Sequence, residues 1–283
     1  MATIPELLRA GRTLSVEFFP PKTPEGHAQL DATLRAFEPL HLSFVSVTYG
    51  AGGTNRDVTR EIVVGINDAW PFPAMPHLTC IGHSRVELEA MLDDYVAAGI
   101  DNVLALAGDP PADGSPAEGD FTYASELVDL VRARGDMAIG VAAFPEVHPR
   151  SAARAEDRRH LAAKLAAADF GITQFFFDPD DYLVMIDELA ALGCHTPVLP
   201  GIMPMTNPTS IRRFAAMNDA AFPEELAAKV EAAVDGAERL RIVVDSTVEL
   251  CQELLDRGVP GLHFYCLNRP EVTLGVVEAL GLR

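Results

Sequence analysis

Short apolar runs alternate with longer helical patterns along the whole chain. Most of these runs are apolar on both faces, as strands buried in a parallel sheet are. They predict eight strands, over residues 14–19, 44–48, 77–80, 102–106, 138–144, 172–176, 198–202 and 261–264.

The segments between these strands have helical signals. Residues 84–98 begin with the capping box Ser84-x-x-Glu87 and are followed by Gly99, a residue type that commonly ends a helix. Strands separated by helices imply parallel crossovers, and eight such units close into a (β/α)₈ barrel. We therefore expect an α/β protein with a TIM-barrel fold, one domain over residues 1–283. An open doubly wound sheet is the alternative, but no G-x-G-x-x-G pattern follows any strand.

Two connections depart from the regular alternation. Residues 108–120 form an irregular stretch after the fourth strand, at the end of the barrel where such enzymes hold their active sites. We expect this loop to be functional or mobile. The connection between strands seven and eight contains extra helix, from Pro223 to about Arg257, which we expect to pack at the rim as one or two helices.

Composition and charge narrow the class of protein. Hydrophobic residues make up 48% of the chain and charged residues 22%, which suits a globular protein with a large core. The formal net charge of −19 repels phosphate backbones and anionic lipid, so neither nucleic acid nor a membrane surface is an expected partner. An anionic ligand must therefore be held by a few local cations.

The cysteines and the N-terminus indicate the compartment. Four cysteines without C-x-x-C spacing are too few for a disulfide scaffold, so we expect reduced thiols. The first residues lack the features of a signal peptide, and no stretch has the length of a membrane span. The predicted location is the cytoplasm. The sequence leaves the oligomeric state open, with a homo-oligomer as one alternative.

Polar residues fall where the predicted strands end. Because the carboxyl ends of parallel strands meet at one end of a barrel, these residues are expected to lie near one another. They are Glu17, Thr48, Tyr49, His77, Asp109, His148, Gln174, Asn268 and Arg269. Glu17 comes just before Pro20-Pro21, which forces the chain out of the sheet, so it is the first candidate acid or base.

Several of these residues also have structural explanations. Asp109 precedes Pro110 and could cap a turn, His77 could be a satisfied barrel histidine, and Arg269 could pair with a surface carboxylate. Gln174 lies in an apolar run, where an amide costs free energy unless a partner bonds it. A ligand is a plausible partner for this amide.

Other site types find no support in the sequence. No H-x-H, H-E-x-x-H or D-x-D-x-D-G spacing occurs, so no metal site is expected. A G-x-S-x-G elbow is also absent. Residues 51–54 are glycine-rich but lack the lysine of a phosphate-binding loop, and we interpret them as a mobile loop.

Taken together, the strings at the strand ends resemble those of the methylenetetrahydrofolate reductases. Eight strings agree in order along the chain: EFFPP (17–21), SVTYGA (46–51), PHLTC (76–80), LAGD (106–109), PEVHP (145–149), ITQFFFD (172–178), PGI (200–202) and HFYCLNR (263–269). The resemblance implies a TIM barrel that reduces 5,10-methylenetetrahydrofolate to 5-methyltetrahydrofolate with NADH or NADPH. It covers the catalytic domain, so the C-terminal regulatory domain of larger relatives, and inhibition by S-adenosylmethionine through it, are not expected.

The resemblance also implies roles for individual residues. Glu17 matches the general acid that helps to open the five-membered ring of the folate, for which burial would have to raise its pKa. Asp109 matches the aspartate near the pterin, and Arg269 a folate-binding arginine. Gln174 matches a glutamine that contacts folate and nicotinamide in turn. Thr48 and Phe214 match nicotinamide-binding positions.

Most members of this family use FAD as a hydride relay, and the flavin positions are only partly retained here. The positions that agree are Tyr49, His77, Gly108, Asp109, Ala124, His148, Asp157 and Lys164. Those that depart are Ala107 and Ala163, where the family has arginine, Phe144 in place of Tyr, and His160 in place of Asn. Each lost bond from an arginine to the diphosphate would remove about 1.5–3 kcal/mol. Arg154, Arg158 or Arg159 could reach the same space instead.

We therefore expect a variant without flavin, in which hydride passes directly from the nicotinamide dinucleotide to the folate. The alternatives are the same reaction through bound FAD by a ping-pong mechanism, and a folate-binding barrel without catalysis. A different barrel enzyme, such as an aldolase, shares only the fold, and no lysine stands at a strand end for a Schiff base. The sequence does not decide between NADH and NADPH or show how many glutamates the folate tail has.

Overall fold

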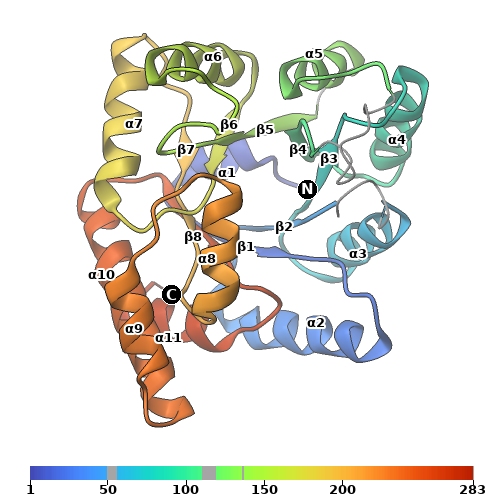
Figure 1. The fold of residues 1–283 in the computed structure, drawn as a ribbon. Coiled ribbons are helices and arrows are strands. Elements are labelled where there is room, and N and C mark those ends of the chain that lie inside the picture. The colour runs from blue at the N-terminus through green and yellow to red at the C-terminus, as the bar shows by residue number, and fades with distance from the viewer. Residues whose placement is uncertain (50–55, 110–118, 136, 283) are drawn as a thin grey trace.

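The computed structural model describes residues 1–49, 56–109, 119–135 and 137–282, and within them the predicted TIM barrel is confirmed. Neighbouring strands are all parallel, in the order β7-β6-β5-β4-β3-β2-β1-β9-β8. The strands surround an apolar interior (Figure 1). They are β1 (Thr13–Phe18), β2 (Phe44–Val47), β3 (Ala74–Thr79), β4 (Asn102–Leu106), β5 (Ala138–Ala143), β6 (Phe170–Thr173), β7 (Val198–Leu199), β8 (Gly201–Ile202) and β9 (Gly261–Tyr265).

The seventh predicted strand is divided in two at Pro200. Proline has no N–H group to donate to a sheet, so the pairing changes partner at this residue. β7 pairs with β6, whereas β8 pairs with β9. Gly201 N instead donates to the Oγ1 of Thr173 at 2.8 Å, and His263 N donates to Pro200 O at 3.1 Å. The two short strands thus form one stave that joins the edges of the sheet.

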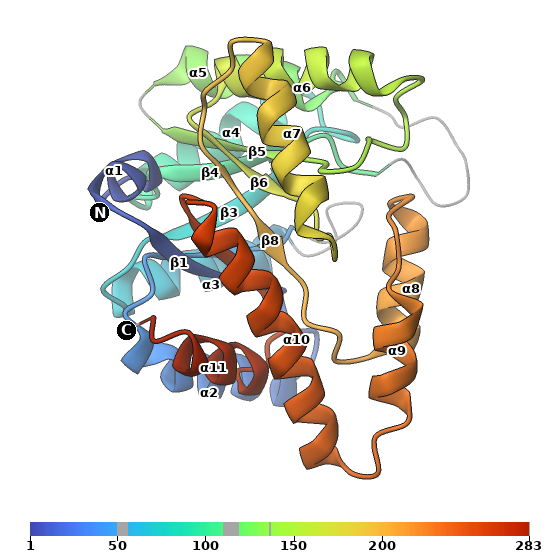
Figure 2. The same cartoon turned by 90° about the vertical axis from the view of Figure 1, so that its left-hand side faces the viewer.

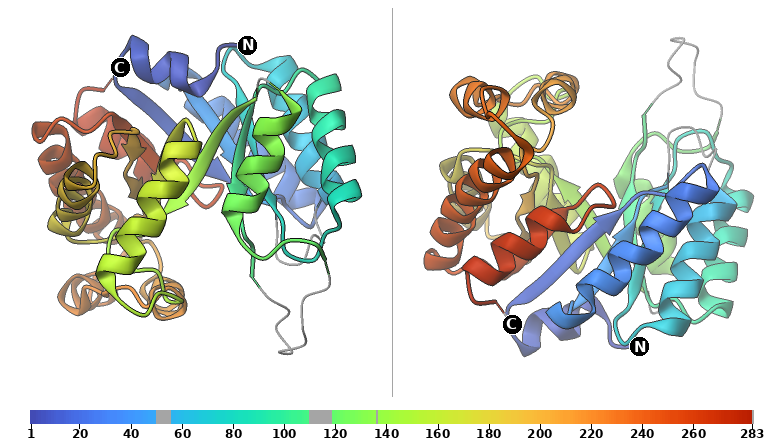
Figure 3. Two further views of the ribbon diagram at one scale, coloured as in Figure 1. Left: turned by 90° about the horizontal axis from the view of Figure 1, so that it is seen from above. Right: turned by 90° about the horizontal axis from the view of Figure 1, so that it is seen from below.

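Helices cover the outside of the barrel, and Figure 3 shows several of them side by side along the strands. Those that follow the staves are α2 (Pro24–Phe37), α3 (Arg56–Ala69), α4 (Arg85–Ala97), α5 (Ala124–Arg134), α6 (Arg154–Ala167), α7 (Pro179–Ala191), α10 (Gly236–Asp256) and α11 (Glu271–Ala279). Their inner faces are apolar, as the buried Val243, Cys251 and Leu254 of α10 illustrate. Full burial of such a side chain stabilises the fold by about 1.5–3 kcal/mol.

The predicted extra helix between the seventh and eighth staves is confirmed, with one difference in detail. α10 packs against α7 and α11 and so belongs to the outer ring. The added helices are α8 (Pro208–Met217) and α9 (Glu224–Glu231), which Figure 2 shows on the side of the molecule opposite α1 (Ile4–Ala10). Of these two, α9 packs against α10. The connection between them is held by Glu146, whose carboxylate accepts the N–H of Ala221 at 2.9 and 3.0 Å.

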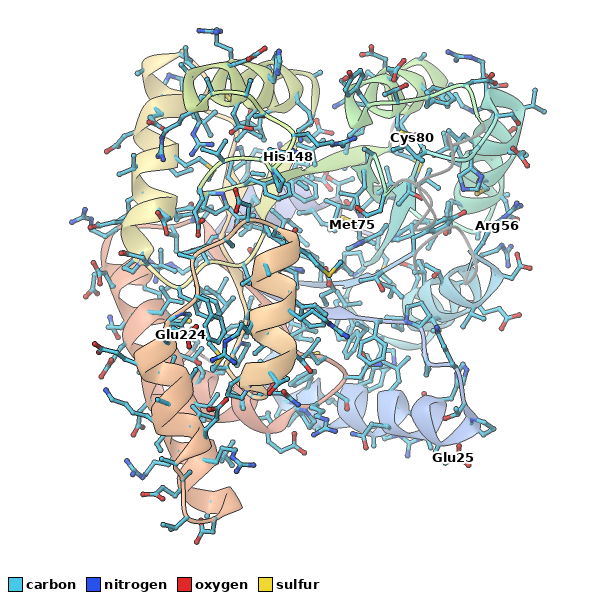
Figure 4. All side chains as sticks on the ribbon, in the orientation of Figure 1. Glu25, Arg56, Met75, Cys80, His148 and Glu224 are labelled. Carbon is cyan, nitrogen blue, oxygen red and sulfur yellow. The ribbon has the colours of Figure 1, made fainter. Side chains whose placement is uncertain are left out.

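A short helix that the strand pattern did not predict, α1 (Ile4–Ala10), lies at the other end of the barrel from α8 (Figure 2). Ile4 is fully buried in a second apolar cluster with Phe44, Met75 and Phe170. Figure 4 shows Met75 near the middle of the molecule. Ile4 N also donates to the Oδ1 of Asn102 at 2.7 Å. This helix therefore closes the amino end of the barrel, and the opposite end holds the polar groups.

Candidate active site

Glu17 lies inside the barrel, near the carboxyl end of β1. Register pairs it with Ser46 of β2 and with Tyr265 of β9. Its Oε2 lies 3.3 Å from the Nε2 of His77 and 3.8 Å from the Nε2 of His263, and its side chain is 17% exposed. A carboxylate between two imidazoles, reached from three strands, is an arrangement that can store and move a proton.

The pKa of Glu17 departs from the expectation. Burial acts to raise the pKa, as expected for a general acid, but the attraction of the neighbouring imidazoles of His77 and His263 outweighs it. The result is a pKa lowered from its ordinary value of 4.5 to about 2. The expectation of a raised pKa was wrong, because it did not include the two histidines, which come from distant parts of the chain.

His263 is a member of the site that sequence reasoning did not single out. Its Nδ1 lies 2.8 Å from the Oγ of Ser15, and its Nε2 lies 3.4 Å from the Oγ of Ser46. The ring stacks on Phe44 with centroids 5.8 Å apart. Burial lowers the pKa of His263, which favours the neutral ring. The signal in the sequence was alternation, which places His263 and Tyr265 on the same face of one strand.

The turn after β9 is tied to the end of β1. Asn268 Oδ1 accepts from Phe19 N at 3.0 Å, and Asn268 Nδ2 donates to Phe19 O at 2.9 Å. Leu267 and Asn268 both have positive φ values, a conformation that this pair of hydrogen bonds supports. Arg269 follows on the same turn and is exposed, so the turn presents its side chain to solvent at the carboxyl end of the barrel.

Tyr265 also faces this region. Its hydroxyl donates to the backbone oxygen of Thr173, across the barrel. Burial, together with the charge of Glu17, raises its pKa well above the ordinary value, so the phenol keeps its proton.

We expected Gln174 to lie inside a strand, but β6 ends at Thr173, so Gln174 follows the strand. Its Oε1 accepts from the N–H of Phe175 at 3.0 Å, and its side chain is half-buried. The amide oxygen therefore has a local partner. Among the described residues, no hydrogen bond of its Nε2 group is found, so this donor is available at the strand end.

The other predicted substrate positions follow the ends of strands or lie on α8. Thr48 follows β2 and is half-buried, and its backbone oxygen accepts from Thr59 at 2.9 Å. Phe214 lies on α8, half-buried, with the guanidinium of Arg213 5.5 Å from its ring centroid. Asp109 is exposed, after Gly108, whose φ of +87° suits glycine. The roles of these residues stay predictions.

Three of the flavin positions have protein partners or a structural role. The Tyr49 hydroxyl lies 3.2 Å from the Nε2 of His83 and is buried beside α4, which raises its pKa to about 12. Ala124 is the first residue of α5. His148 packs edge-on against Phe144, with centroids 4.4 Å apart, on the loop after β5 (Figure 4).

Asp157 and Arg158 form a buried ion pair at the start of α6. Arg158 Nη1 donates to Asp157 Oδ2 at 2.6 Å, and Arg158 Nε donates to Glu188 at 2.7 Å. The remaining donors of this guanidinium contact the backbone oxygens of residues 144–146. Arg154 pairs with the same Glu188 at 2.8 Å. The guanidinium of Arg158 is therefore fully engaged by the protein, and Arg154 binds Glu188 through its Nε.

Lys164 and Arg159 complete the set of nearby cations on α6. Lys164 Nζ donates to Ala142 O at 2.7 Å, and burial lowers its pKa to about 8. Arg159 is exposed and lines a surface pocket with Ala163 that extends to Cys194, beyond the end of α7. Because helices of this barrel run back from the carboxyl ends of the strands, that pocket lies toward the amino end.

The fold and this site define a class of protein, a TIM-barrel enzyme with a carboxylate–imidazole centre at the carboxyl end of the strands. Sequence comparison then gives the family. The family model for methylenetetrahydrofolate reductase matches residues 3–281. The chain belongs to this family of oxidoreductases.

Individual relatives agree with this assignment. The 5,10-methylenetetrahydrofolate reductase of Escherichia coli (strain K12) is 38% identical over 273 residues, which cover 95% of this chain and 91% of that protein. Methylenetetrahydrofolate reductase (NADH) 1 of Zea mays is 34% identical over 302 residues, covering 100% of this chain and 51% of that protein.

Solved structures confirm the fold alone, since their sequences are distant. A protein from Clostridium thermocellum described as binding two copies of 5-methyl-5,6,7,8-tetrahydrofolic acid has a TM-score of 0.65 at 13% identity, covering 97% of this chain and 96% of its own. Dihydropteroate synthase from Xanthomonas albilineans has a TM-score of 0.51 at 15% identity, covering 96% of this chain and 93% of its own.

Two further findings concern the described part of the chain. None of its helices combines the length and apolar character needed to cross a membrane. Nor do three or more His, Cys, Asp or Glu side chains in that part come together as a metal site.

Proposed function

We propose that this enzyme reduces 5,10-methylenetetrahydrofolate to 5-methyltetrahydrofolate by direct hydride transfer from NADH or NADPH, without flavin. The observation that supports the reaction is the position of Glu17, shielded from water and in contact with His77 at the carboxyl end of the barrel. Simple binding of folate would not need an acid in such a place. The catalytic reading is therefore favoured over a folate-binding barrel without activity.

Glu17 supplies the proton for ring opening. The bond between the bridging carbon and one folate nitrogen breaks, that nitrogen takes the proton, and an iminium cation remains on the other nitrogen. The carboxylate of Asp109 stabilises this positive charge. Hydride from C4 of the dihydronicotinamide then reduces the iminium carbon to a methyl group. Arg269 binds the folate, and Thr48 and Phe214 position the nicotinamide. The free Nε2 group of Gln174 contacts the folate and the nicotinamide.

The residues at the flavin positions fit a flavin diphosphate poorly. Ala107 and Ala163 offer no charge. Of the arginines that could replace them, Arg158 is bonded to Glu188 and to the backbone, and Arg154 is bonded to Glu188. The ammonium group of Lys164 is directed at Ala142 O. Bonds to charged groups contribute about 1.5–3 kcal/mol each, so several missing bonds weaken binding by orders of magnitude. For this reason no step of the proposed reaction uses flavin.

The nicotinamide donor and the compartment complete the proposal. The maize relative bears NADH in its name, and we propose NADH as the physiological donor here. We also propose that the enzyme works in the cytoplasm, where the four cysteines, which are free in the structure, stay reduced.

Two measurements on the purified protein test the proposal. Initial rates with both substrates varied should give intersecting lines, because both substrates must be bound together, and the protein should lack the visible absorbance of flavin. Parallel lines with stoichiometric FAD would establish the ping-pong alternative. No oxidation of NADH or NADPH on addition of 5,10-methylenetetrahydrofolate would leave only the folate-binding alternative.

A further inference from the structure

The side chain of His77 reaches Glu17 from a strand that does not neighbour β1. β2 lies between β1 and β3, so the two side chains meet across the barrel interior. Nε2 of His77 and Oε2 of Glu17 are 3.3 Å apart, with side chains 9% and 17% exposed. The alignment falls short of a hydrogen bond, and among the described residues this nitrogen is a buried polar atom without a hydrogen-bond partner.

An unpartnered buried nitrogen costs free energy unless it has a task or a partner in another state. A small rotation of the His77 ring would convert the contact with Glu17 into a charge-assisted hydrogen bond. The atom is therefore directed at the carboxylate, and its environment suits the exchange of a proton between the two groups.

The other titratable groups that face Glu17 are less suited to this exchange. His263 lies farther away, at 3.8 Å, and its two nitrogens contact the hydroxyls of Ser15 and Ser46. Tyr265 donates its hydroxyl proton to Thr173 O. His77 on β3 is the remaining partner for a proton that moves to or from Glu17.

We propose that His77 is a positioning residue that shares one proton with Glu17, so that the pair, and not the carboxyl group alone, provides the proton for ring opening. We assign the shared proton to Nε2 of His77 until folate binds, with Glu17 as the carboxylate, the form that its lowered pKa favours. Binding of the flat pterin excludes water and lowers the local dielectric, which favours the neutral form of the pair. This inference rests on the proposed function.

The proton balance of the step is closed. The proton moves from His77 Nε2 to Glu17 Oε2, giving neutral imidazole and carboxylic acid. The carboxylic acid then gives it to the folate nitrogen as the carbon–nitrogen bond breaks, which leaves a carboxylate. Hydride from the nicotinamide completes the methyl group. The pair regains one proton from water after the product leaves.

The test compares His77→Gln, His77→Asn and the control His27→Gln, an exposed histidine on α2. Turnover, folate KM and the pH profile of kcat are measured for each, and circular dichroism checks folding. We expect the His77 variants to lose about 10²-fold or more in kcat with little change in folate KM, and to lose one ionisation from the pH profile. The control should match the wild type.

The double variant Glu17→Gln/His77→Gln separates a shared role from two independent ones. If the residues act as a unit, the double variant should lose no more activity than Glu17→Gln alone. Losses that multiply, or a His77→Gln enzyme with the wild-type pH profile, would overturn the inference. If neither His77 variant folds, nitrogen NMR of the imidazoles provides the test. We expect a protonated His77 ring in the wild type and a neutral His77 ring in Glu17→Gln. The same protonation state of His77 in both proteins would contradict the inference. A wild-type enzyme without turnover would instead defeat the proposed function.

Discussion

The guanidinium of Arg158 and the carboxylate of Asp157, adjacent in sequence at the start of α6, form an ion pair at 2.6 Å with both side chains less than a tenth exposed. Arg158 also bonds Glu188 and the backbone oxygens after β5. The guanidinium therefore supports the loop after β5.

Replacing Arg158 with Met should therefore destabilise the fold. The change leaves Asp157 buried without its cation, a loss of about 3–5 kcal/mol. Urea unfolding followed by circular dichroism measures the change. Arg159→Met is the matched control, since this neighbour is exposed and should change stability by no more than about 0.5 kcal/mol. Equal midpoints for the two variants would show that the pair is not structural.

Glu17→Gln should remove most of the turnover. The amide cannot donate a carboxylic proton, and general acid catalysis contributes about 10²–10⁴-fold in rate. The folate KM should change little, because the shape of the side chain is retained. The control is Glu25→Gln at the outer start of α2, which Figure 4 shows at the edge of the molecule. Wild-type kcat in Glu17→Gln would exclude Glu17 as the acid.

The lowered pKa of Glu17 makes part of the stability pH-dependent. Its pKa falls from 4.5 to about 2 in the folded enzyme, so its contribution is complete above the unfolded value and is lost as the pH falls from about 5 to about 2. The size is on the order of 3 kcal/mol. The difference in unfolding free energy between wild type and Glu17→Gln should shrink over this range. A difference that is constant with pH would mean that the histidines do not stabilise the carboxylate.

Arg269→Ala should raise the folate KM. This exposed guanidinium stands on the turn that Asn268 fixes to the end of β1, and a charged bond to a folate carboxylate of about 1.5–3 kcal/mol corresponds to about 10- to 100-fold. The KM for the nicotinamide dinucleotide should stay the same. Arg257→Ala, at the end of α10, is the control for general loss of positive charge. An unchanged folate KM would show that Arg269 does not contact the substrate.

Local patterns were sufficient to predict the barrel, since eight apolar runs separated by helices leave few other folds. They could not predict that Pro200 divides one stave, because which strand each half pairs with depends on tertiary contacts. α1 was missed because its burial depends on residues of five different strands. The strand pattern placed Glu17 and His77 on their strands correctly, but it did not predict the contact between them. The expected direction of the pKa shift of Glu17 was wrong because this pKa depends on His77 and His263, which lie 60 and 246 residues away in the sequence.

Isotope transfer tests the central claim, direct hydride transfer, most directly. The enzyme is supplied with NADH that is deuterated at C4, one face at a time, in ordinary water, and the methyl group of the product is analysed by mass spectrometry. Direct transfer predicts that one of the two donors places a full deuterium in the methyl group. A relay through reduced flavin would exchange the label with water. A methyl group that contains no deuterium, whichever of the two labelled donors is used, would therefore contradict the account.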